Sequence, residues 1–318
     1  MPDKPRMMVF GQATAHMHGR LAEVFEVLQP APDDRAQVLA EQGAGIAYAM
    51  LVGHVPIGAD VLDQLPDLKI LSNFGVGYDA IDTAAAIERG VLVTHTPDVL
   101  NDEVANTAIL LMLAVARDMV RDEAYVRAGR WATEGAAPLS RSVKGLTVGI
   151  VGFGRIGQAI AEKLTVFGTR TVYHARSDKG VEYEFYASLS DMARDSDILI
   201  AITPGGAETR HLINSDVIEA LGPQGILINV ARGSVVDETA LIAALQDGRL
   251  GAAGLDVFEK EPHVPADLIA LPNVTLLPHV GSATVETRQA MGDLAVDNLL
   301  RFRETGQAVT PVPECKTT

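Results

Sequence analysis

Short apolar runs alternate with amphipathic stretches along most of the chain. In the first hundred residues, four apolar runs predict strands, at 7–10, 47–52, 70–73 and 91–94. Residues 19–28 have a helical pattern between the first two of these runs. Strands that alternate with helices are typical of βαβ units, whose strands pair in parallel. The first part of the chain is therefore expected to be a small α/β domain.

A long helical pattern begins near residue 101. Asn101 or Asp102 suits a helix cap, Glu103 stands in the first turn, and the pattern runs through 103–128. We expect the charges of Asp102 and Glu103 to favour the helix start rather than to take part in a reaction. The apolar stretch 108–113 fits a buried interface between subunits and equally an interdomain core.

A second βα series begins at Lys144. Its pattern predicts strand 146–151, helix 156–167, strands 170–174, 197–202 and 225–230, helix 238–247, strands 252–257 and 273–277, and helix 285–305. The last helix follows this series and could return to the first domain. We therefore expect two domains, residues 1–99 with 286–318 and residues 100–285.

Composition narrows the classes of function. The 318 residues are enough for two domains, and the contents of 47% hydrophobic and 21% charged residues predict a sizeable core. The net charge of −15 disfavours nucleic acid and anionic membranes as partners, because both need basic patches. The longest apolar run, 108–116, is too short to span a bilayer.

Cysteine content and the N-terminal residues suggest a compartment. Cys315 is the single cysteine, so the chain can form neither an internal disulfide nor a cysteine metal cluster, which suits a reducing cytosol. The stretch MPDKPRMMVFGQ contains no long apolar segment, so we expect no signal peptide and a cytoplasmic protein. No metal site is expected.

The stretch VGIVGFGRIGQAIAEKL, residues 148–164, contains glycines at the spacing G-x-G-x-x-G. Gly152 permits a tight turn, Gly154 lets the backbone approach a pyrophosphate, and Gly157 lets helix and strand pack closely. The motif follows a predicted strand and opens a predicted helix, whose N-terminus offers N–H groups to phosphates. A tight turn without a ligand is the alternative, but this context favours a dinucleotide.

The end of the next strand indicates which dinucleotide binds. An NAD site usually places Asp or Glu there for the ribose 2′-hydroxyl, whereas this strand ends in YHA, residues 173–175. Arg176, Ser177 and Lys179 follow, and an arginine fork with a hydroxyl suits a 2′-phosphate. Asp178 lies past the expected strand end. The sequence thus favours NADP(H), with NAD(H) possible, and a solvated Arg176 is the alternative.

Three further segments place polar side chains after predicted strands. Arg232 follows a strand in LINVARGSVVDE, and His279 follows a strand and a proline in NVTLLPHVGSAT. Asp256 ends a strand in AGLDVFEKEP, where Glu261 precedes a proline. In open α/β sheets, ligands bind outside the carboxyl ends of the strands. These side chains are therefore candidates for one site.

With FGVGYDAID in the first domain, these segments resemble the D-isomer-specific 2-hydroxyacid dehydrogenase family. The matching motifs are the glycine loop, NVARGSVVDE, GLDVFEKEP and LLPHVGSAT. Within the family, RLGAAGLDVFEKEPHVP and LLPHVGSATVETR most resemble the NADPH-dependent glyoxylate/hydroxypyruvate reductases and the hydroxyphenylpyruvate reductases. The resemblance implies two Rossmann-like or flavodoxin-like α/β domains with parallel sheets. The NADP-binding Rossmann domain, 100–285, would be inserted into the substrate-binding domain.

The resemblance implies catalytic roles for three side chains. Arg232 would pair with the substrate carboxylate and polarise the keto oxygen. His279 would donate a proton to the forming alkoxide while hydride arrives from C4 of the nicotinamide, and Glu261 would hold the His279 ring and favour imidazolium. The backbone N–H groups of Val76 and Gly77 would bind the same carboxylate, because the glycines of FGVGYD let the main chain come close.

The resemblance also implies cofactor contacts from several segments. Asp256 would hold the nicotinamide side, and Thr107 would touch the cofactor from the interdomain helix. Thr203 and Pro204 would pass along the adenosine side. The remaining cofactor-binding candidates are Arg155, Ile156, Thr209, Val230, Ala231, Arg232, His279 and Gly281. Ser282 is a further substrate-binding candidate.

The reaction that this resemblance implies is the NADPH-dependent reduction of a small 2-keto acid to the D-2-hydroxy acid. Glyoxylate, hydroxypyruvate and phenylpyruvates are the candidate substrates. A formate dehydrogenase-like enzyme is one alternative, but that subgroup pairs its histidine with glutamine, whereas this chain has Glu261. An NAD(P)-sensing binding protein on the same fold is the other alternative. It would keep its function after substitution of His279.

The family also implies a homodimer, formed through 103–128 and the loop that follows. In that loop, Trp131 could cover the substrate of a partner subunit or serve as a buried anchor. Other side chains are expected to have no catalytic role. We expect His16 and His18 in a loop, and His211, Lys260 and His263 at the surface.

Overall fold

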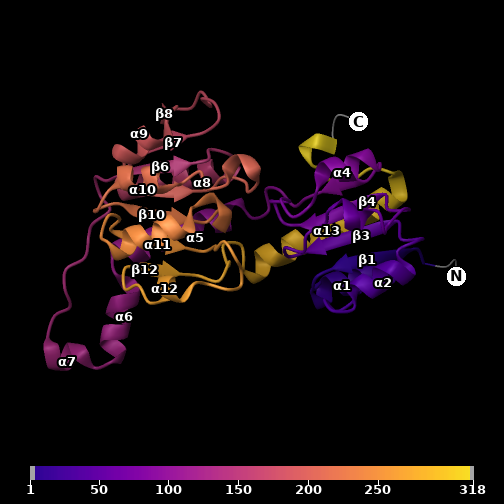
Figure 1. Ribbon diagram of the computed structural model, residues 1–318, viewed down its shortest axis with the longest axis horizontal. Coiled ribbons are helices and arrows are strands. Elements are labelled where there is room, and N and C mark those ends of the chain that lie inside the picture. The colour runs from indigo at the N-terminus through magenta and orange to yellow at the C-terminus, as the bar shows by residue number, and fades with distance from the viewer. Residues whose placement is uncertain (1–3, 316–318) are drawn as a thin grey trace. The chain divides into compact units, whose positions relative to one another are not determined.

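The computed structural model describes residues 4–315. The chain divides into two compact units: residues up to Leu100 together with those from Thr284 onward, and Asn101–Ala283. Each unit contains its own parallel β-sheet (Figure 1). Two separate parallel sheets with helices between their strands form the α/β architecture that the alternating pattern predicted.

The first unit contains a five-stranded sheet in the order β2-β1-β3-β4-β5. The strands are β1 (Arg6–Phe10), β2 (Glu26–Leu28), β3 (Tyr48–Val52), β4 (Ile70–Phe74) and β5 (Leu92–Thr94). Neighbours pair in parallel throughout. Met7 and Val9 of β1 belong to one apolar cluster, whereas Met8 and Phe10 belong to another. The sheet is thus covered on both faces, as parallel sheets require.

Helices from both ends of the chain cover this sheet. They are α1 (Ala15–Val24), α2 (Arg35–Gln42), α3 (Ala59–Leu62), α4 (Thr83–Glu88) and α13 (Val285–Thr305), with a 3-10 turn η4 (Pro313–Cys315). The C-terminal helix α13 packs against α1 and β4. Ser72 of β4 donates a hydrogen bond to the Ala295 carbonyl at 2.8 Å. The C-terminal residues are therefore part of the first unit.

The second unit contains a seven-stranded parallel sheet in the order β12-β11-β10-β9-β6-β7-β8. The strands are β6 (Thr147–Val151), β7 (Arg170–His174), β8 (Glu184–Tyr186), β9 (Ile198–Ala201), β10 (Ile226–Asn229), β11 (Ala252–Leu255) and β12 (Val274–Leu276). β6 pairs with both β7 and β9. The chain order reverses at β6, and ligands of doubly wound sheets bind at such a switch point.

The helices of the second unit cover both faces of its sheet (Figure 1). They are α5 (Asn101–Ala116), α8 (Arg155–Leu164), α9 (Leu189–Arg194), α10 (Ser215–Leu221), α11 (Glu238–Gln246) and α12 (Ala266–Ile269), with 3-10 turns η1 (Thr165–Phe167), η2 (Ala207–Thr209) and η3 (Gly233–Val235). α5 packs on α8, β10 and β11. Most of its apolar stretch 108–113 is therefore buried within this unit, although the side chain of Leu110 is exposed.

Two further helices project from this sheet as an arm (Figure 1). They are α6 (Met119–Arg127) and α7 (Arg130–Glu134), and we call residues 117–140 the arm. Asp118 separates α6 from α5 and has a left-handed backbone, with φ of 51°. The arm carries exposed apolar side chains: Met119, Val120, Val126, Trp131 and Leu139.

Several predicted elements were wrong. The predicted helix 19–28 begins earlier, at Ala15 after the cap Thr14, and ends at Val24, because residues 26–28 pair with β1 as β2. His16 and His18 therefore lie in α1 rather than in a loop. The predicted continuous helix 103–128 is two helices, since its chain turns at Asp118. Three helices of the first unit, and the segments β8, α9, α10 and α12, were not predicted.

Among the described residues, none of the helices combines the length and the apolar character that crossing a membrane requires.

Candidate active site

The glycine loop lies between β6 and α8. Gly152 has φ of 99°, and a Cβ added to it would lie 2.9 Å from the Ile202 carbonyl oxygen. A Cβ on Gly157 would lie 2.3 Å from the Gly152 carbonyl oxygen, so only glycine allows this close approach. A Cβ on Gly154 would meet nothing within 4 Å. The loop is therefore tight where it packs on the protein and open at Gly154.

No side chain of the described residues caps the N-terminus of α8. Gly154 occupies the cap position, and the first turn contains no acidic residue. Arg155 and Ile156 begin this helix, which starts one residue before the predicted start at 156. Open space beside uncapped N–H groups at the start of a ten-residue helix is the arrangement that binds a pyrophosphate. These residues fit a dinucleotide.

Thr203 follows β9 at the same edge of the sheet. Its Oγ1 is buried and has no hydrogen-bond partner among the described residues. Its methyl carbon lies 2.9 Å from the Cβ position built on Gly152, so it borders the glycine loop. The predicted Thr209 instead donates its hydroxyl hydrogen bond to the Pro204 carbonyl at 2.7 Å, and thereby closes the turn that follows. Of these two predicted threonines, Thr203 is therefore the one whose buried hydroxyl has no hydrogen-bond partner among the described residues.

At the end of β7, the residues predicted to contact a 2′-phosphate are exposed. Arg176 has 93% of its side chain exposed, and its ion pair is with Glu208, which is also largely exposed, at 3.8 Å. Asp178 accepts hydrogen bonds from the Tyr173 hydroxyl at 2.6 Å and from the Gly180 N–H at 2.9 Å. Both hydrogen bonds lower the pKa of the Asp178 carboxyl, and the bond from the Tyr173 hydroxyl has the larger effect.

The Arg232 turn follows β10 and is held by Asn229. The buried Asn229 side chain accepts from the Ala231 N–H at 3.0 Å and donates to the Arg232 carbonyl at 3.0 Å. The Arg232 guanidinium donates to the Ala231 carbonyl at 2.8 Å. Val230 pairs its N–H with the Ala201 carbonyl, which ties the turn to β9. One amide side chain thus fixes the backbone that presents the arginine.

The segment 258–261 packs directly on this turn. A Cβ on Gly233 would lie 1.9 Å from the Phe258 carbonyl carbon, so the two backbones touch where Gly233 has no side chain. Phe258 in turn donates its N–H to Glu261 Oε1 at 3.0 Å. Consequently Arg232 and Glu261 lie on adjoining backbone segments of one unit.

His279 and Glu261 form a pair. His279 Nδ1 lies 2.7 Å from Glu261 Oε2, and the two side chains are 30% and 25% exposed. His279 has a left-handed backbone with φ of 53°, which is uncommon for a residue with a Cβ. Its N–H is held by the Asp256 carbonyl at 2.8 Å. Strained conformations of this kind gather at functional sites.

The Asp256 carboxylate holds the turn that presents this histidine. It is 2% exposed, and its two oxygens accept from the Val280 N–H at 2.7 Å and the Gly281 N–H at 2.8 Å. Burial raises the pKa of the Asp256 carboxyl. Thr107 donates its hydroxyl to the Gly281 carbonyl at 3.2 Å. Ser282 lies in the same turn, which the Ala283 N–H closes on the Val280 carbonyl.

Both oxygens of Asp256 and the hydroxyl of Thr107 are therefore bonded to this turn. The structure shows a supporting role for both residues, and their contact with the cofactor stays a prediction.

Val76 and Gly77 lie after β4 in the first unit. Asn73 donates its amide hydrogens to the carbonyls of Gly75 and Gly77 at 3.1 and 3.0 Å. The Val76 carbonyl lies 3.0 Å from His95 Nδ1. Among the described residues, no acceptor takes the N–H of Val76 or of Gly77. The loop therefore directs its carbonyls into the protein and leaves two neighbouring N–H groups for a ligand.

Sequence reasoning missed the side chains that hold these segments. Asn73 and Asn229 are buried and each holds the turn that follows its strand. The available signal was an asparagine at the end of each apolar run, because its amide can bond the turn. His211 was wrongly assigned to the surface: it is partly buried and pairs with Glu259 beside the Glu261 segment.

Trp131 is 64% exposed, so the predicted alternative of a buried anchor is wrong for the single chain.

Comparisons with known proteins agree with this geometry. The NAD-binding domain of D-isomer-specific 2-hydroxyacid dehydrogenases matches residues 109–281. Glyoxylate/hydroxypyruvate reductase A of Arabidopsis thaliana is 44% identical over 302 residues, which cover 94% of this chain and 96% of that protein. Hydroxyphenylpyruvate reductase of Plectranthus scutellarioides is 48% identical over 287 residues, or 89% of this chain and 90% of that protein.

A solved structure extends the similarity to nearly the whole chain. It is the NADPH-dependent glyoxylate/hydroxypyruvate reductase of Sinorhizobium meliloti in complex with NADP and malonate. The two chains are 48% identical and superpose with a TM-score of 0.94 over 98% of each. With the glycine loop, Arg232 and the His279–Glu261 pair in place, this chain belongs to the D-isomer-specific 2-hydroxyacid dehydrogenase family.

Proposed function

We propose that the protein reduces small 2-keto acids to D-2-hydroxy acids with NADPH. The observation that carries this proposal is the pairing of His279 Nδ1 with Glu261 Oε2 at 2.7 Å, on a segment that packs against the Arg232 turn. A histidine held by a carboxylate can donate a proton, and a neighbouring guanidinium can bind a carboxylate. Both groups are what reduction of a keto acid requires.

NADPH supplies the hydride when it is bound. The residues that would hold it are those of the glycine loop, with the N–H groups of α8 on the pyrophosphate and the Thr203 hydroxyl beside them. Arg176, Ser177 and Lys179 would face the 2′-phosphate, because exposed cationic and hydroxyl groups follow β7 where an NAD site has a carboxylate.

His279 would give its proton to the oxygen of the forming hydroxyl group. Because Nδ1 is bonded to Glu261, the proton would leave from Nε2. The Glu261 carboxylate fixes the orientation of the ring through its hydrogen bond with Nδ1. The Asp256 carboxylate, through the N–H groups of Val280 and Gly281, keeps the His279 turn in place. After the transfer, His279 is neutral and regains its proton from water.

The substrate carboxylate would be bound by Arg232 and by the N–H groups of Val76 and Gly77. The support is that Asn73 and His95 take up the carbonyls of that loop, while its two N–H groups have no partner among the described residues. Adjacent N–H groups form a concavity that suits an anion.

The names of the relatives indicate which keto acids to test. The Arabidopsis relative is named for glyoxylate and hydroxypyruvate, and the Plectranthus relative for hydroxyphenylpyruvate. We propose these three acids as candidate substrates. The preference for NADPH follows from the residues after β7 and agrees with the name of the Sinorhizobium enzyme.

We propose that the partner is a second copy of this chain, bound through the arm. The arm exposes Val126, Trp131 and Leu139, which is 98% exposed, and burial of such side chains between copies would stabilise a dimer. Trp131 could then cover the substrate of the partner subunit. The compartment that we propose is the cytoplasm, since Cys315 is the chain's single cysteine.

The reaction can be tested with the purified chain. Oxidation of NADPH and NADH should be followed with each of the three keto acids, and the product separated on a chiral column. We expect turnover with NADPH, slower turnover with NADH, and the D-product. Formation of the L-product would contradict the proposal, and so would the absence of turnover with all three acids. Equal rates with both cofactors would contradict the NADPH preference alone.

A further inference from the structure

The loop after β7 contains a carboxylate among groups that favour a phosphate. Arg176, Ser177 and Lys179 surround Asp178 in the sequence. A carboxylate beside the 2′-phosphate would repel it, and a carboxylate paired with Arg176 would neutralise the arginine. NADPH binding through this loop, which the proposed function assumes, therefore requires that Asp178 be held elsewhere.

The structure shows what holds it. Asp178 Oδ1 accepts from the Tyr173 hydroxyl at 2.6 Å and from the Gly180 N–H at 2.9 Å. The same hydroxyl accepts from the Lys179 N–H at 2.8 Å. A single phenol oxygen thus binds both the side chain of Asp178 and the backbone of the next residue. Arg176 does not pair with Asp178, although only one residue separates them, and pairs with Glu208 instead.

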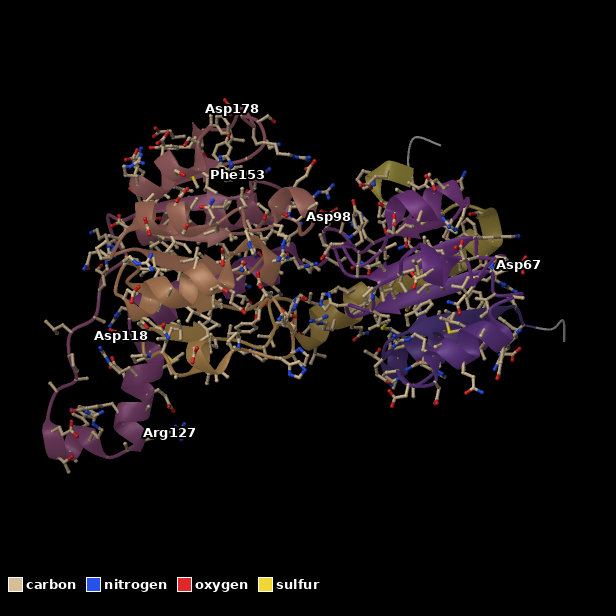
Figure 2. All side chains as sticks on the ribbon, viewed as in Figure 1. Asp67, Asp98, Asp118, Arg127, Phe153 and Asp178 are labelled. Carbon is tan, nitrogen blue, oxygen red and sulfur yellow. The ribbon has the colours of Figure 1, made fainter. Side chains whose placement is uncertain are left out.

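Tyr173 is itself fixed by packing. It is 0% exposed in β7, and its ring stacks on Phe153 of the glycine loop with centroids 4.2 Å apart and planes at 28°. The ring of Phe185 in β8 lies 5.5 Å away. Figure 2 labels Phe153 and Asp178, which lie on the side of this unit formed by β6, β7 and β8. The hydroxyl is therefore an immobile anchor beneath an exposed loop.

We propose that Tyr173 determines cofactor specificity by holding Asp178 away from the 2′-phosphate site. It is a positioning residue, because its ring is buried and its hydroxyl acts through Asp178 and Lys179. The inference rests on the proposed preference for NADPH and adds to it the residue that maintains the preference. No motif in the sequence indicated this role, since a tyrosine in a buried strand has ordinary packing as its simplest interpretation.

The test compares the binding of two fragments to the whole chain by calorimetry. The probes are adenosine 2′,5′-bisphosphate, which carries the 2′-phosphate, and adenosine 5′-monophosphate, which lacks it. The variant Tyr173→Phe keeps the ring on Phe153 and removes only the hydroxyl. We expect the ratio of the two affinities to fall by about tenfold, because a freed carboxylate can approach Arg176 or the phosphate.

A double variant separates charge from structure. In Tyr173→Phe/Asp178→Asn the loop is equally free of the tyrosine hydroxyl but carries no negative charge at residue 178. We expect it to recover most of the wild-type ratio. The proposal is overturned if Tyr173→Phe keeps the wild-type ratio of affinities. It is also overturned if Tyr173→Phe lowers the ratio and the added Asp178→Asn substitution does not restore it, since the loss would then come from disordered structure.

The wild-type ratio tests the proposed function separately. If the wild-type chain binds both fragments equally, the NADPH preference fails, and Tyr173 has no specificity to maintain. If the wild-type ratio is high and only the Tyr173→Phe result disagrees, the NADPH preference stands and the role of Tyr173 alone is wrong.

Discussion

The backbone of His279 shows how the site depends on single residues. Its φ of 53° is kept by the Asp256 carbonyl, and the next two N–H groups are kept by the Asp256 carboxylate. The ring is then turned to Glu261. The buried Asp256 therefore holds the backbone of the turn, and the partly buried Glu261 holds the ring of His279. Each can be changed separately.

Substitution of His279 tests the proton donor. His279→Gln keeps a polar side chain of similar size but cannot donate an acidic proton. We expect the rate of keto acid reduction to fall by about 10²–10⁴-fold, the usual contribution of a general acid. Steady-state kinetics with NADPH and hydroxypyruvate would measure it, with the exposed His18→Gln as the control that keeps wild-type rates. A loss of less than tenfold would count against His279.

Substitution of Asp256 tests the turn. In Asp256→Asn one side-chain oxygen becomes an NH₂ group, so one of the N–H groups of Val280 and Gly281 loses its acceptor. We expect the free energy of unfolding at neutral pH to fall by about 1–3 kcal/mol. Urea denaturation would measure it, and wild-type stability of the variant would contradict the account.

The pH dependence of this difference has a definite sign. Burial raises the pKa of Asp256 in the folded state above its ordinary value of 3.8, so the folded chain binds this proton more tightly than the unfolded chain. The stabilising contribution is complete below that value and is lost as pH rises through the folded pKa. The destabilisation of Asp256→Asn relative to wild type should therefore shrink as the pH rises above about 4. If the stability difference between wild type and Asp256→Asn instead grew as pH rises, burial would not be the dominant influence on the pKa of Asp256.

At the scale of elements, the glycine loop and the start of α8 form the proposed cofactor site. Two glycines of this loop differ in the space that is available for a side chain. A Cβ on Gly157 would lie 2.3 Å from the backbone of Gly152, whereas a Cβ on Gly154 would enter open space. They therefore form a matched pair of positions for the same substitution.

We expect Gly154→Ala to fold with the wild-type melting temperature and to bind NADPH more weakly, because its methyl group enters the space that a pyrophosphate needs. Gly157→Ala should instead lower the melting temperature, since the helix must move away from the loop. Thermal melts and fluorescence titration with NADPH would measure both. Equal melting temperatures of the two variants would show that the loop is less closely packed than the structure indicates.

The elements that the sequence predicted well are those whose own residues carry a clear apolar pattern. The strand pattern before Gly152 and the apolar strands of the second unit were found because parallel strands buried on both faces are continuously apolar. The three residues of β2 were assigned to a helix, because so short an edge strand, half-exposed, has no periodicity of its own. The break at Asp118 was missed because no glycine or proline marks it in the sequence, although the backbone of Asp118 is left-handed there.

The residues of the candidate site also fall into a group that local sequence predicts and a group that it does not. Arg232, Glu261 and His279 stand in recognisable segments after strands, so the sequence predicted them as one group. The residues that hold these segments meet across long stretches of chain. His211 and Glu259, for example, are 48 positions apart. Nothing local to either residue indicates such a contact, which depends on how the strands are ordered in the sheet.

At the scale of the whole molecule, the arm is the feature that a single chain leaves unexplained. It extends from the second unit and carries Asp118 at its base and Arg127 farther out (Figure 2). Its apolar side chains face solvent, and an exposed apolar surface of this kind indicates a partner. We expect the purified chain to be a dimer in solution.

Two substitutions in the arm test this expectation. Trp131→Ser with Leu139→Ser removes the largest exposed apolar groups and leaves the sheet untouched. Light scattering should show a dimer for wild type and a monomer, or a concentration-dependent mixture, for the variant. Val166→Ser, which changes an exposed apolar residue outside the arm, should remain dimeric. A wild-type monomer, or a dimeric double variant, would contradict the role of the arm.

In the proposed reaction, His279, held by Glu261, donates the proton when a keto acid is reduced. The most direct measurement is the single-turnover rate of NADPH oxidation with hydroxypyruvate as a function of pH, for wild type and Glu261→Gln. We predict that the wild-type rate falls at alkaline pH, because neutral imidazole cannot donate the proton. In Glu261→Gln we expect a lower rate over the whole pH range, because no carboxylate then holds the ring of His279 in place. Flat or superimposable profiles would contradict the claim.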